Sequence, residues 1–477
     1  MNSKHKTQDI APSAALSQEE VEANNRMAIG VLIPLLITFI LGTLCLQGFN
    51  LVFQQIGKDV GAPQQAPLIT SFPIIVLGIV CFIYGSLGDF VSLKKLVYFG
   101  LGMLVVGSVL GFLLNYYFTP NLWTVIVARV LQTAGEQVAG SAYLVVTTKY
   151  LKPSLRALFF GIFSAGYQVS AAIGVFAAGI LSAISWQFLF LVPAVTILLL
   201  PFLRNLPDHN GTGSKVDTVG FLIFGFATAF LTLFFSYKLW WLLLVAIGLF
   251  LVFGIYIHQA KNPFITPAFF KNTRWILAIL LIAVFYFVNY CAGPLVNAIA
   301  RDVYHLETHE VSNYLAWSFI LAAVTATLAG AIVRKIGRTP VIIFSASLMA
   351  LSFILPAFFV DKGMGWVYIM SFMFYGGTGL MYAPVVSTVI DTLPTSESGR
   401  GVGLNDLIMN VTASIGIATF GGSLFGGAGE STSITGLTGA AATFSNIMLI
   451  CGAIFVAGLV YYLVVYRYIA RTPRVAE

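Results

Sequence analysis

Long apolar segments alternate with short polar ones along almost the whole chain. A transmembrane helix needs about 20 consecutive, mainly apolar residues, and the pattern predicts fourteen such helices. Six come first, a pair follows the polar loop at 204–217, and six more follow a second polar loop at 258–274. The predicted spans are residues 27–50, 66–88, 95–116, 121–148, 156–183, 186–203, 217–236, 239–257, 275–299, 312–333, 340–360, 366–390, 404–424 and 443–466. The predicted fold is therefore that of an all-α, polytopic membrane protein.

The same pattern divides the chain into domains. Residues 1–26 are polar, lack the apolar stretch of a signal peptide, and are predicted to form a cytosolic N-terminal tail. Residues 27–203 are predicted to form a six-helix bundle, 204–274 a linker with two extra transmembrane helices, and 275–466 a second six-helix bundle. Residues 467–477 are predicted to form a C-terminal cytosolic tail.

The composition excludes several classes of protein. Of the 477 residues, 58% are hydrophobic and only 9% are charged, and the mean hydropathy is +0.91. Soluble domains are about half apolar and about a quarter charged, so a soluble enzyme, a disordered chain and a disulfide scaffold are all excluded. The apolar residues lie in runs and do not alternate, which is not the pattern of an outer-membrane barrel.

The basic residues predict the orientation, because the cytoplasmic loops of membrane proteins are enriched in Lys and Arg. With the N-terminus inside, Arg129 lies within a span and every Lys or Arg outside the spans falls on the cytosolic side, except for Lys58, Lys238, Arg301 and Lys362. The chain is thus predicted to be a multi-pass protein of the plasma membrane with both termini in the cytoplasm. The formal net charge of +7 reflects this topology, and no nucleic-acid partner is expected.

The two six-helix blocks look like repeats of each other. The loop between the second and third predicted helices reads GSLGDFVSLKK from Gly85 to Lys95, and the matching loop of the second block reads GAIVRKIGRTP from Gly330 to Pro340. In both loops the glycine is expected to end a helix, and basic residues follow. Parallel six-helix repeats around a central site are an architecture of secondary transporters.

Five segments carry a family resemblance. The loop Gly85–Lys95 and the helix motif Arg129–Gly135 are the specific ones, and the supporting ones are Ser185–Phe188, Asp217–Gly220 and Asn262–Trp275. With these motifs the chain resembles the major facilitator superfamily, and more narrowly its fourteen-helix drug/proton antiporters of the tetracycline-efflux kind. The resemblance covers nearly the whole chain. It implies a major facilitator fold with 6+2+6 helices that alternates access between the two sides of the membrane. It also implies a gating role for the loop motif, made of Gly85, Asp89, Lys94 and Lys95.

The chain departs from those antiporters in several places. The stretch Gly166–Gly179 in the fifth span lacks the Gly-Pro motif of the family and has Gln168 where relatives carry an acid. The first span has no acidic residue, and the thirteenth has Asp406 near its start instead of an acid deep inside the span. Arg334 stands in the second loop where the first loop has Asp89. These departures leave open whether the chain exports drugs against protons and whether tetracycline is a substrate.

Ionisable residues inside a span are expensive and mark function, and the chain has few of them. Arg129 and Glu136 lie seven residues apart in the fourth span, which places them within about 20° of one helical face and about 10 Å apart along the axis. They are candidates for proton coupling, as a protonatable carboxylate near a cation, and a purely structural pair is the alternative. Asp406, near the predicted start of the thirteenth span, is a further candidate, and helix capping is its alternative role.

Polar residues form stripes on two predicted spans. The stripes are Thr43, Gln47, Asn50 and Gln54 in the first span, and Asn289, Gly293 and Asn297 in the ninth. Because polar groups that face lipid are costly, the stripes are expected to face a substrate cavity or else to hold helices together. The candidates for the substrate cavity are Gln47, Asn50, Gln132, Gln168, Asn289 and Asn410.

No cofactor and no metal site is expected. His305 and His309 in a predicted external loop lack a third zinc ligand, and the glycine-rich stretch at 421–441 lacks the Gly-Lys-Ser/Thr ending of a P-loop. Transport is therefore expected to be secondary. The expected partners are a small-molecule substrate, protons and the lipid bilayer, and the protein is expected to be a monomer.

The leading hypothesis is a secondary active transporter, not an enzyme, that exports drug-like or amphipathic small molecules in exchange for protons. Multidrug efflux and antibiotic resistance would follow from that activity. A facilitator or a proton-linked transporter of a metabolite is the first alternative, and a membrane sensor that keeps the fold without transport is the second. The sequence names neither the substrate, nor the coupling ion, nor the direction of transport.

Overall fold

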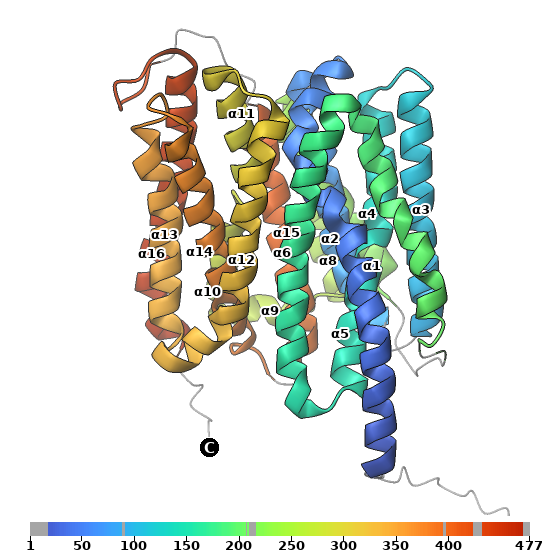
Figure 1. Ribbon diagram of the computed structural model, residues 1–477. Helices are drawn as coiled ribbons and strands as arrows, with labels where there is room; N and C mark the ends of the chain where they lie inside the picture. The colour runs from blue at the N-terminus through green and yellow to red at the C-terminus, as the bar shows by residue number, and fades with distance from the viewer. Residues whose placement is uncertain are drawn as a thin grey trace, which may run out of the picture.

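The structure, a computed structural model, describes residues 18–87, 91–206, 208, 216–394, 397–422 and 432–470. Every named secondary-structure element in these residues is a helix, and an isolated antiparallel bridge joins Thr432 to Thr438. The prediction of an all-α membrane protein is confirmed. In Figure 1 the helices stand side by side, and α1 (Gln18–Asp59) begins on the side of the molecule on which α16 (Gly439–Ile469) ends. We call this the terminal side and the opposite one the distal side.

The first bundle runs from α1 to η2. α1 begins at Gln18, so residues 18–26, which were assigned to the N-terminal tail, are helical. The last element, η2, is wound as a 3₁₀ helix and contains Pro193 and Pro201, which have no N–H to donate within the helix. The elements are α1, η1 (Pro63–Gln65), α2 (Leu68–Leu87), α3 (Leu93–Tyr116), α4 (Leu122–Glu136), α5 (Val138–Tyr150), α6 (Pro153–Ile184) and η2 (Trp186–Leu203).

A helical pair and the second bundle complete the chain. α7 packs against α2 of the first bundle and against α15 of the second. Asp217 caps the start of α7, accepting from the Gly220 N–H at 2.9 Å, and also accepts from the Phe264 N–H at 2.8 Å. The elements are α7 (Thr218–Tyr237), α8 (Trp240–Gln259), α9 (Pro267–Lys271), α10 (Thr273–Tyr286), α11 (Ala292–Tyr304), α12 (Thr308–Ile336), α13 (Arg338–Ala357), α14 (Met364–Ile390), α15 (Ser398–Phe420) and α16.

Twelve helices in the described residues are long and apolar enough to cross a membrane, and each coincides with a predicted span. The two remaining predicted spans, 121–148 and 275–299, fall on the helix pairs α4/α5 and α10/α11. These pairs are interrupted at Gln137 and at residues 287–291. The multi-pass architecture is confirmed, while the count of fourteen spans stays a prediction.

Pro294 explains the interruption between α10 and α11. Its ring nitrogen carries no hydrogen, so it cannot donate to the Tyr290 carbonyl four residues earlier, and its ring clashes with that carbonyl in a regular helix. The freed carbonyl instead accepts a hydrogen bond of 3.0 Å from Nδ2 of Asn50 on α1. Non-helical backbone at membrane depth persists only where neighbours satisfy its polar groups, so the interruption depends on α1.

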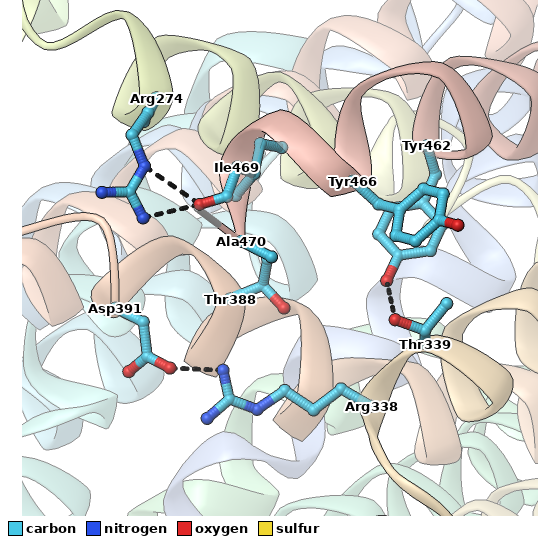
Figure 2. A pocket seen from close by; sticks show the side chains of 9 residues that line it. All are labelled: Arg274, Arg338, Thr339, Thr388, Asp391, Tyr462, Tyr466, Ile469 and Ala470. Atoms are coloured by element: carbon cyan, nitrogen blue, oxygen red, sulfur yellow. Dashed lines mark hydrogen bonds and ion pairs between the residues drawn. The ribbon is translucent and has the colours of Figure 1, made fainter. Parts of the chain in front are cut away.

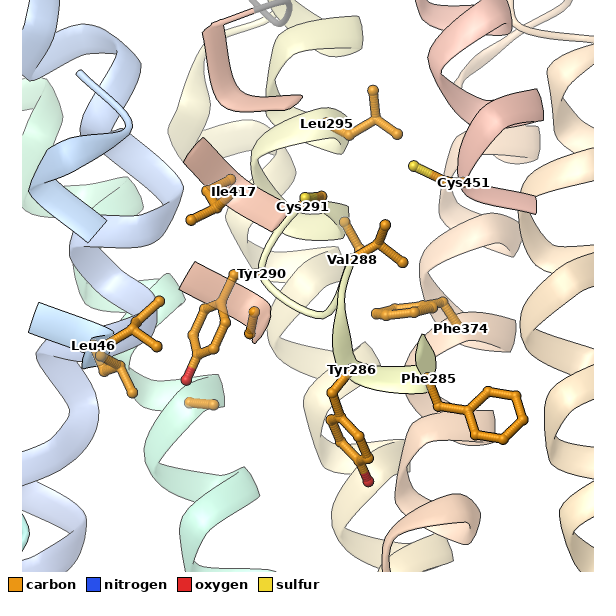
Figure 3. Packing of buried hydrophobic residues seen from close by; sticks show 14 of the residues in the cluster. Leu46, Phe285, Tyr286, Val288, Tyr290, Cys291, Leu295, Phe374, Ile417 and Cys451 are labelled. Carbon is orange, nitrogen blue, oxygen red and sulfur yellow. The ribbon is translucent and has the colours of Figure 1, made fainter. Parts of the chain in front are cut away.

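Close helix approach holds this region together. A Cβ atom at Gly416 of α15 would lie 1.6 Å from the Phe287 carbonyl oxygen, and one at Gly174 of α6 would lie 1.9 Å from the Leu44 carbonyl oxygen of α1. Only glycine allows the backbones to come so near. Figure 3 shows the interrupted segment with Tyr290 directed toward the first bundle and Phe285 toward the second. The segment therefore lies where the two bundles meet.

The glycines of the two repeat loops do not end their helices. α2 continues past Gly85 to Leu87, and α12 continues past Gly330 to Ile336. The second loop turns instead at Gly337, whose φ of +88° suits a residue without a Cβ. The expectation for both loops is wrong, because glycine is common inside membrane helices and does not by itself stop them.

Candidate functional site

The Arg129 side chain is buried in the first bundle and held by neutral groups. Its guanidinium lies over the Phe49 ring of α1, 4.6 Å from the ring centroid, and donates to the Gln132 side-chain oxygen. The Gln132 amide nitrogen donates to Ser108 Oγ of α3 at 2.8 Å and to the Phe190 carbonyl of η2 at 3.2 Å. The aromatic ring and the amide oxygen both stabilise the cation. Arg129 and Gln132 thereby connect α4 to three other helices of the first bundle.

Glu136 is the last residue of α4, one position before the interruption at Gln137, and only 1% of it is exposed. Thr133 Oγ1 lies 3.4 Å from Glu136 Oε2, a long hydrogen bond, and Glu136 Oε1 has no hydrogen-bond partner among the described residues. The ion pairs of the described residues do not include one between Arg129 and Glu136. The two groups share a buried helix without forming a salt bridge.

Polar groups of both bundles meet at the interrupted segment. Asn50 of α1 donates to Gln47 Oε1 at 3.3 Å as well as to the Tyr290 carbonyl. The Tyr290 hydroxyl lies 3.4 Å from the Tyr167 hydroxyl of α6, and Tyr167 lies within electrostatic reach of Glu136. Side chains from α1 and α6 therefore converge on the point at which the α10/α11 helix unwinds.

A second set of contacts joins the bundles toward the distal side. Asn297 of α11 donates to the Leu51 carbonyl of α1 at 3.1 Å, and Arg301 Nη1 donates to Gln54 Oε1 at 2.9 Å. Arg301 also forms a two-point contact with Asp302, at 2.6 and 2.7 Å. Gln54 and Asn297 therefore hold helices together, which is the alternative role considered for the polar stripes.

Asp406 lies inside α15, which begins at Ser398 after the N-cap residue Glu397. The capping role is therefore wrong, because the helix begins earlier than the apolar pattern predicts. The Tyr382 hydroxyl of α14 donates to Asp406 Oδ1 at 3.2 Å, and Asn410 Nδ2 donates to the Asp406 backbone carbonyl at 2.8 Å. Asp406 also lies within electrostatic reach of Tyr167, so a second carboxyl group approaches the same interface from the second bundle.

Two candidates for the substrate cavity stand apart from these contacts. Gln168 of α6 and Asn289 of the interrupted segment are half-buried, and within the described part of the chain neither side-chain amide makes a hydrogen bond. Gln132 belongs to the Arg129 cluster, and Asn410 lies beside Asp406. The predicted residues thus form several small groups along the bundle interface and within each bundle.

Asp89 of the loop motif lies outside the described residues, but the start of α3 is described. Ser92 caps α3 by accepting from the Lys95 N–H at 3.2 Å, and its hydroxyl donates to Asp208 at 2.6 Å. Lys94 is half-buried and Lys95 is exposed. The start of α3, which follows the motif, therefore contacts the segment that comes after η2.

Sequence reasoning missed Tyr167 and Tyr290 as members of the site. The available signal was Pro294, a proline inside the predicted span 275–299, four residues after Tyr290. Such a proline predicts a break in the helix and a free carbonyl next to it. The partner of that carbonyl, Asn50, lies far away in sequence and could not be assigned without the fold.

The family model of the Major Facilitator Superfamily matches residues 30–273 and 278–477. The chain belongs to the major facilitator superfamily. As a member of that superfamily it is a multi-pass membrane transporter of small molecules and not an enzyme. The resemblance to the superfamily, read from the loop and helix motifs, is thereby confirmed.

Two relatives align with most of this chain. It is 22% identical over 362 residues to the riboflavin transporter RibZ of Clostridioides difficile (strain 630), covering 74% of this chain and 78% of the relative. It is 24% identical over 430 residues to the quinolone resistance protein NorB of Staphylococcus aureus (strain Newman), covering 85% of this chain and 89% of the relative.

Solved structures show the same fold. The peptide transporter POT is 15% identical with a TM-score of 0.66, covering 96% of this chain and 99% of that chain. A D-xylose–proton symporter is 13% identical with a TM-score of 0.62, covering 90% of this chain and 97% of that chain. At these identities the likeness concerns the fold alone.

Proposed function

We propose that this superfamily member is a proton-coupled exporter of drug-like or amphipathic small molecules and that Glu136 carries the coupling proton. The observation that supports this most is the Glu136 carboxyl group, which is buried inside a span and has one oxygen without a hydrogen-bond partner among the described residues. An ionised carboxylate there would lose its water without gaining a salt bridge among the described residues, so the protonated group fits this conformation. Transport requires a second conformation in which water reaches the group and takes the proton.

Arg129 has a supporting role in this proposal. It provides a fixed positive charge on the same helix, and its neutral partners Gln132 and Phe49 leave that charge uncompensated by any salt bridge among the described residues. Once the Glu136 proton leaves, the negative charge is balanced across α4. Asp406 offers the second bundle a carboxyl group of its own and is the second candidate for a coupling proton.

We assign the substrate to the interface at the interrupted segment. Amphipathic molecules are bound by aromatic and apolar surfaces with a few well-placed polar groups, and Tyr167, Tyr290, Gln47 and Asn50 supply such a combination. Gln168 and Asn289, whose side-chain amides make no hydrogen bond within the described chain, can bind the substrate. The relative NorB, named for quinolone resistance, supports a drug-like substrate.

The topology and the gate belong to the same proposal. The transporter lies in the plasma membrane as a monomer with both termini in the cytoplasm, so that the terminal side faces the cytosol. The loop motif with Gly85, Asp89, Lys94 and Lys95 then lies on the cytosolic side, where it acts in gating. The bias of basic residues toward this side supports the assignment.

Flux in proteoliposomes under an imposed pH gradient tests the proposal. The parent protein should concentrate a quinolone against its gradient, while Glu136→Gln should insert normally and fail to do so. Asp361→Asn, which changes an acid in the distal loop before α14, is the matched control and should transport like the parent. Full gradient-driven accumulation by Glu136→Gln would remove Glu136 from the coupling mechanism.

A transporter of a metabolite is the second candidate, because the relative RibZ is named a riboflavin transporter. The same vesicles separate the two functions when riboflavin and a quinolone are offered in parallel. Riboflavin flux without quinolone flux would replace the exporter by a vitamin transporter. Flux of neither compound, in a protein that folds and inserts, would favour the non-transporting sensor.

A further inference from the structure

A polar cavity of about 550 Å³ lies on the terminal side of the second bundle, apart from the candidate transport site. It is built from four helix ends, namely the starts of α10 and α13 and the ends of α14 and α16 (Figure 2). The residues that matter here are Arg274, Arg338, Thr339, Asp391, Tyr462 and Tyr466. Neither arginine belongs to the candidate transport site at the bundle interface.

Arg274 keeps part of its donor capacity. Its Nε and Nη2 both donate to the Ile469 carbonyl in the last turn of α16, at 3.0 and 2.6 Å. A guanidinium has five N–H donors in a rigid fork, and Nη1 makes no described contact. Arg274 is thus held in place by α16 while one edge of its fork stays available to a ligand.

Arg338 is also only partly used. Its Nη1 donates to Asp391, at the end of α14, which leaves the Nε and Nη2 donors without a described partner. The neighbouring Thr339 hydroxyl accepts from the Tyr462 hydroxyl at 3.2 Å and keeps its own hydrogen for another acceptor. α13 also begins at Arg338, where no side chain of the described residues caps the first turn and backbone N–H groups favour anions.

From this arrangement we propose that the cavity binds a phosphate group. Among the described residues that line the cavity, two guanidinium groups face one carboxylate, which gives a net positive charge, and the planar guanidinium fork matches phosphate oxygens. The cavity lies where four membrane helices end, which is the depth of lipid headgroups, and basic pockets between helix ends bind anionic headgroups. An anionic phospholipid is the first source of the phosphate, and free inorganic phosphate is the second.

Binding there would stabilise the second bundle. One phosphate held by Arg274 and Arg338 links α10 to α13, and through the Ile469 and Asp391 contacts it also involves α16 and α14. Anything that binds the folded state but not the unfolded state raises the unfolding midpoint. The bound group is therefore detected by stability, without any transport assay.

The test measures the thermal unfolding midpoint of the full-length purified protein with added phosphatidylglycerol, phosphatidylcholine or inorganic phosphate. Phosphatidylglycerol should raise the midpoint more than phosphatidylcholine does. Arg338→Gln and Arg274→Gln should each weaken its apparent affinity by roughly tenfold, the worth of a hydrogen bond from a charged donor. Lys335→Gln, an exposed cation at the end of α12 and outside the cavity, is the matched control and should behave like the parent.

Asp391→Asn gives a result of opposite sign. It removes the carboxylate that competes for Arg338, so phosphatidylglycerol should bind this variant more tightly than the parent. A different result would assign the site to the free ion. In that result inorganic phosphate raises the midpoint only when both arginines are present, while the two lipids change the midpoint equally. Stabilisation that survives in both arginine variants, or that falls equally in Lys335→Gln, would overturn the proposal.

Discussion

Neutral neighbours hold the buried cation of Arg129, and this determines what its removal should cost. The guanidinium depends on the Gln132 oxygen and the Phe49 ring. The Gln132 amide nitrogen in turn donates hydrogen bonds to Ser108 Oγ and to the Phe190 carbonyl. A buried charge that loses its hydrogen-bond acceptor is destabilised, because water cannot reach it to take the place of the acceptor.

Gln132→Leu should therefore destabilise the protein by about 2–3 kcal/mol, because it removes the acceptor of a charged donor. Gln168→Leu is the matched control, since this half-buried amide makes no hydrogen bond within the described chain, and it should cost well under half as much. The free energy of unfolding in mixed micelles measures both. Equal losses would show that Gln132 is not the residue that stabilises Arg129.

At the same scale, sequence periodicity predicted part of the site. Arg129 and Gln132 are three residues apart, a spacing that brings side chains together on a helix, and they do hydrogen-bond. Their contacts to Ser108, Phe49 and Phe190 depend on how α1, α3 and η2 pack, which no local pattern encodes. The capping role predicted for Asp406 is wrong, because apolar periodicity places helix ends poorly and α15 begins at Ser398.

Among the elements, the interruption between α10 and α11 shows how a local residue choice needs a distant partner. Pro294 frees the Tyr290 carbonyl, and Asn50 satisfies it from α1. The boundaries of uninterrupted helices such as α2 and α3 were predicted to within a few residues, because their apolar runs are continuous. The interruption was not, because an apolar run continues through it.

A double-mutant cycle tests this dependence. Asn50→Leu should cost about 1–3 kcal/mol, since it leaves the buried Tyr290 carbonyl without a donor. In a Pro294→Ala background the new N–H at position 294 can donate to that carbonyl, so Asn50→Leu should cost much less. Free energies of unfolding for the four proteins give the coupling. The same loss in both backgrounds would mean that Pro294 and Asn50 act independently.

For the whole molecule, the hydrogen bonds described between the two bundles lie at the interrupted segment or toward the distal side. They include Asn297 to the Leu51 carbonyl and Arg301 to Gln54. Ser414 of α15 adds a bond of 2.9 Å to the Ser71 carbonyl of α2, which lies in the distal part of that helix. The distal side is thus the closed side of this conformation.

Removing the Arg301 contact should open the distal side. Spin labels on cysteines placed at the exposed positions Lys58 and Lys362 report the separation of the two bundles there. Arg301→Ala should increase the population with a long distance between the labels, because Gln54 loses its partner across the interface. Asp361→Asn is the control and should leave the distribution unchanged. An unchanged distribution in Arg301→Ala would show that the apolar contacts alone keep the distal side closed.

The most direct test of the central claim, that Glu136 carries the transported proton, records proton and substrate movement in the same proteoliposomes. In the parent protein, a substrate gradient should drive protons in the opposite direction, seen as a pH change inside the vesicles. In Glu136→Gln, substrate should still exchange across the membrane at equilibrium, but the pH change should disappear. A pH change of parental size in Glu136→Gln would contradict the account and place the coupling proton on another group.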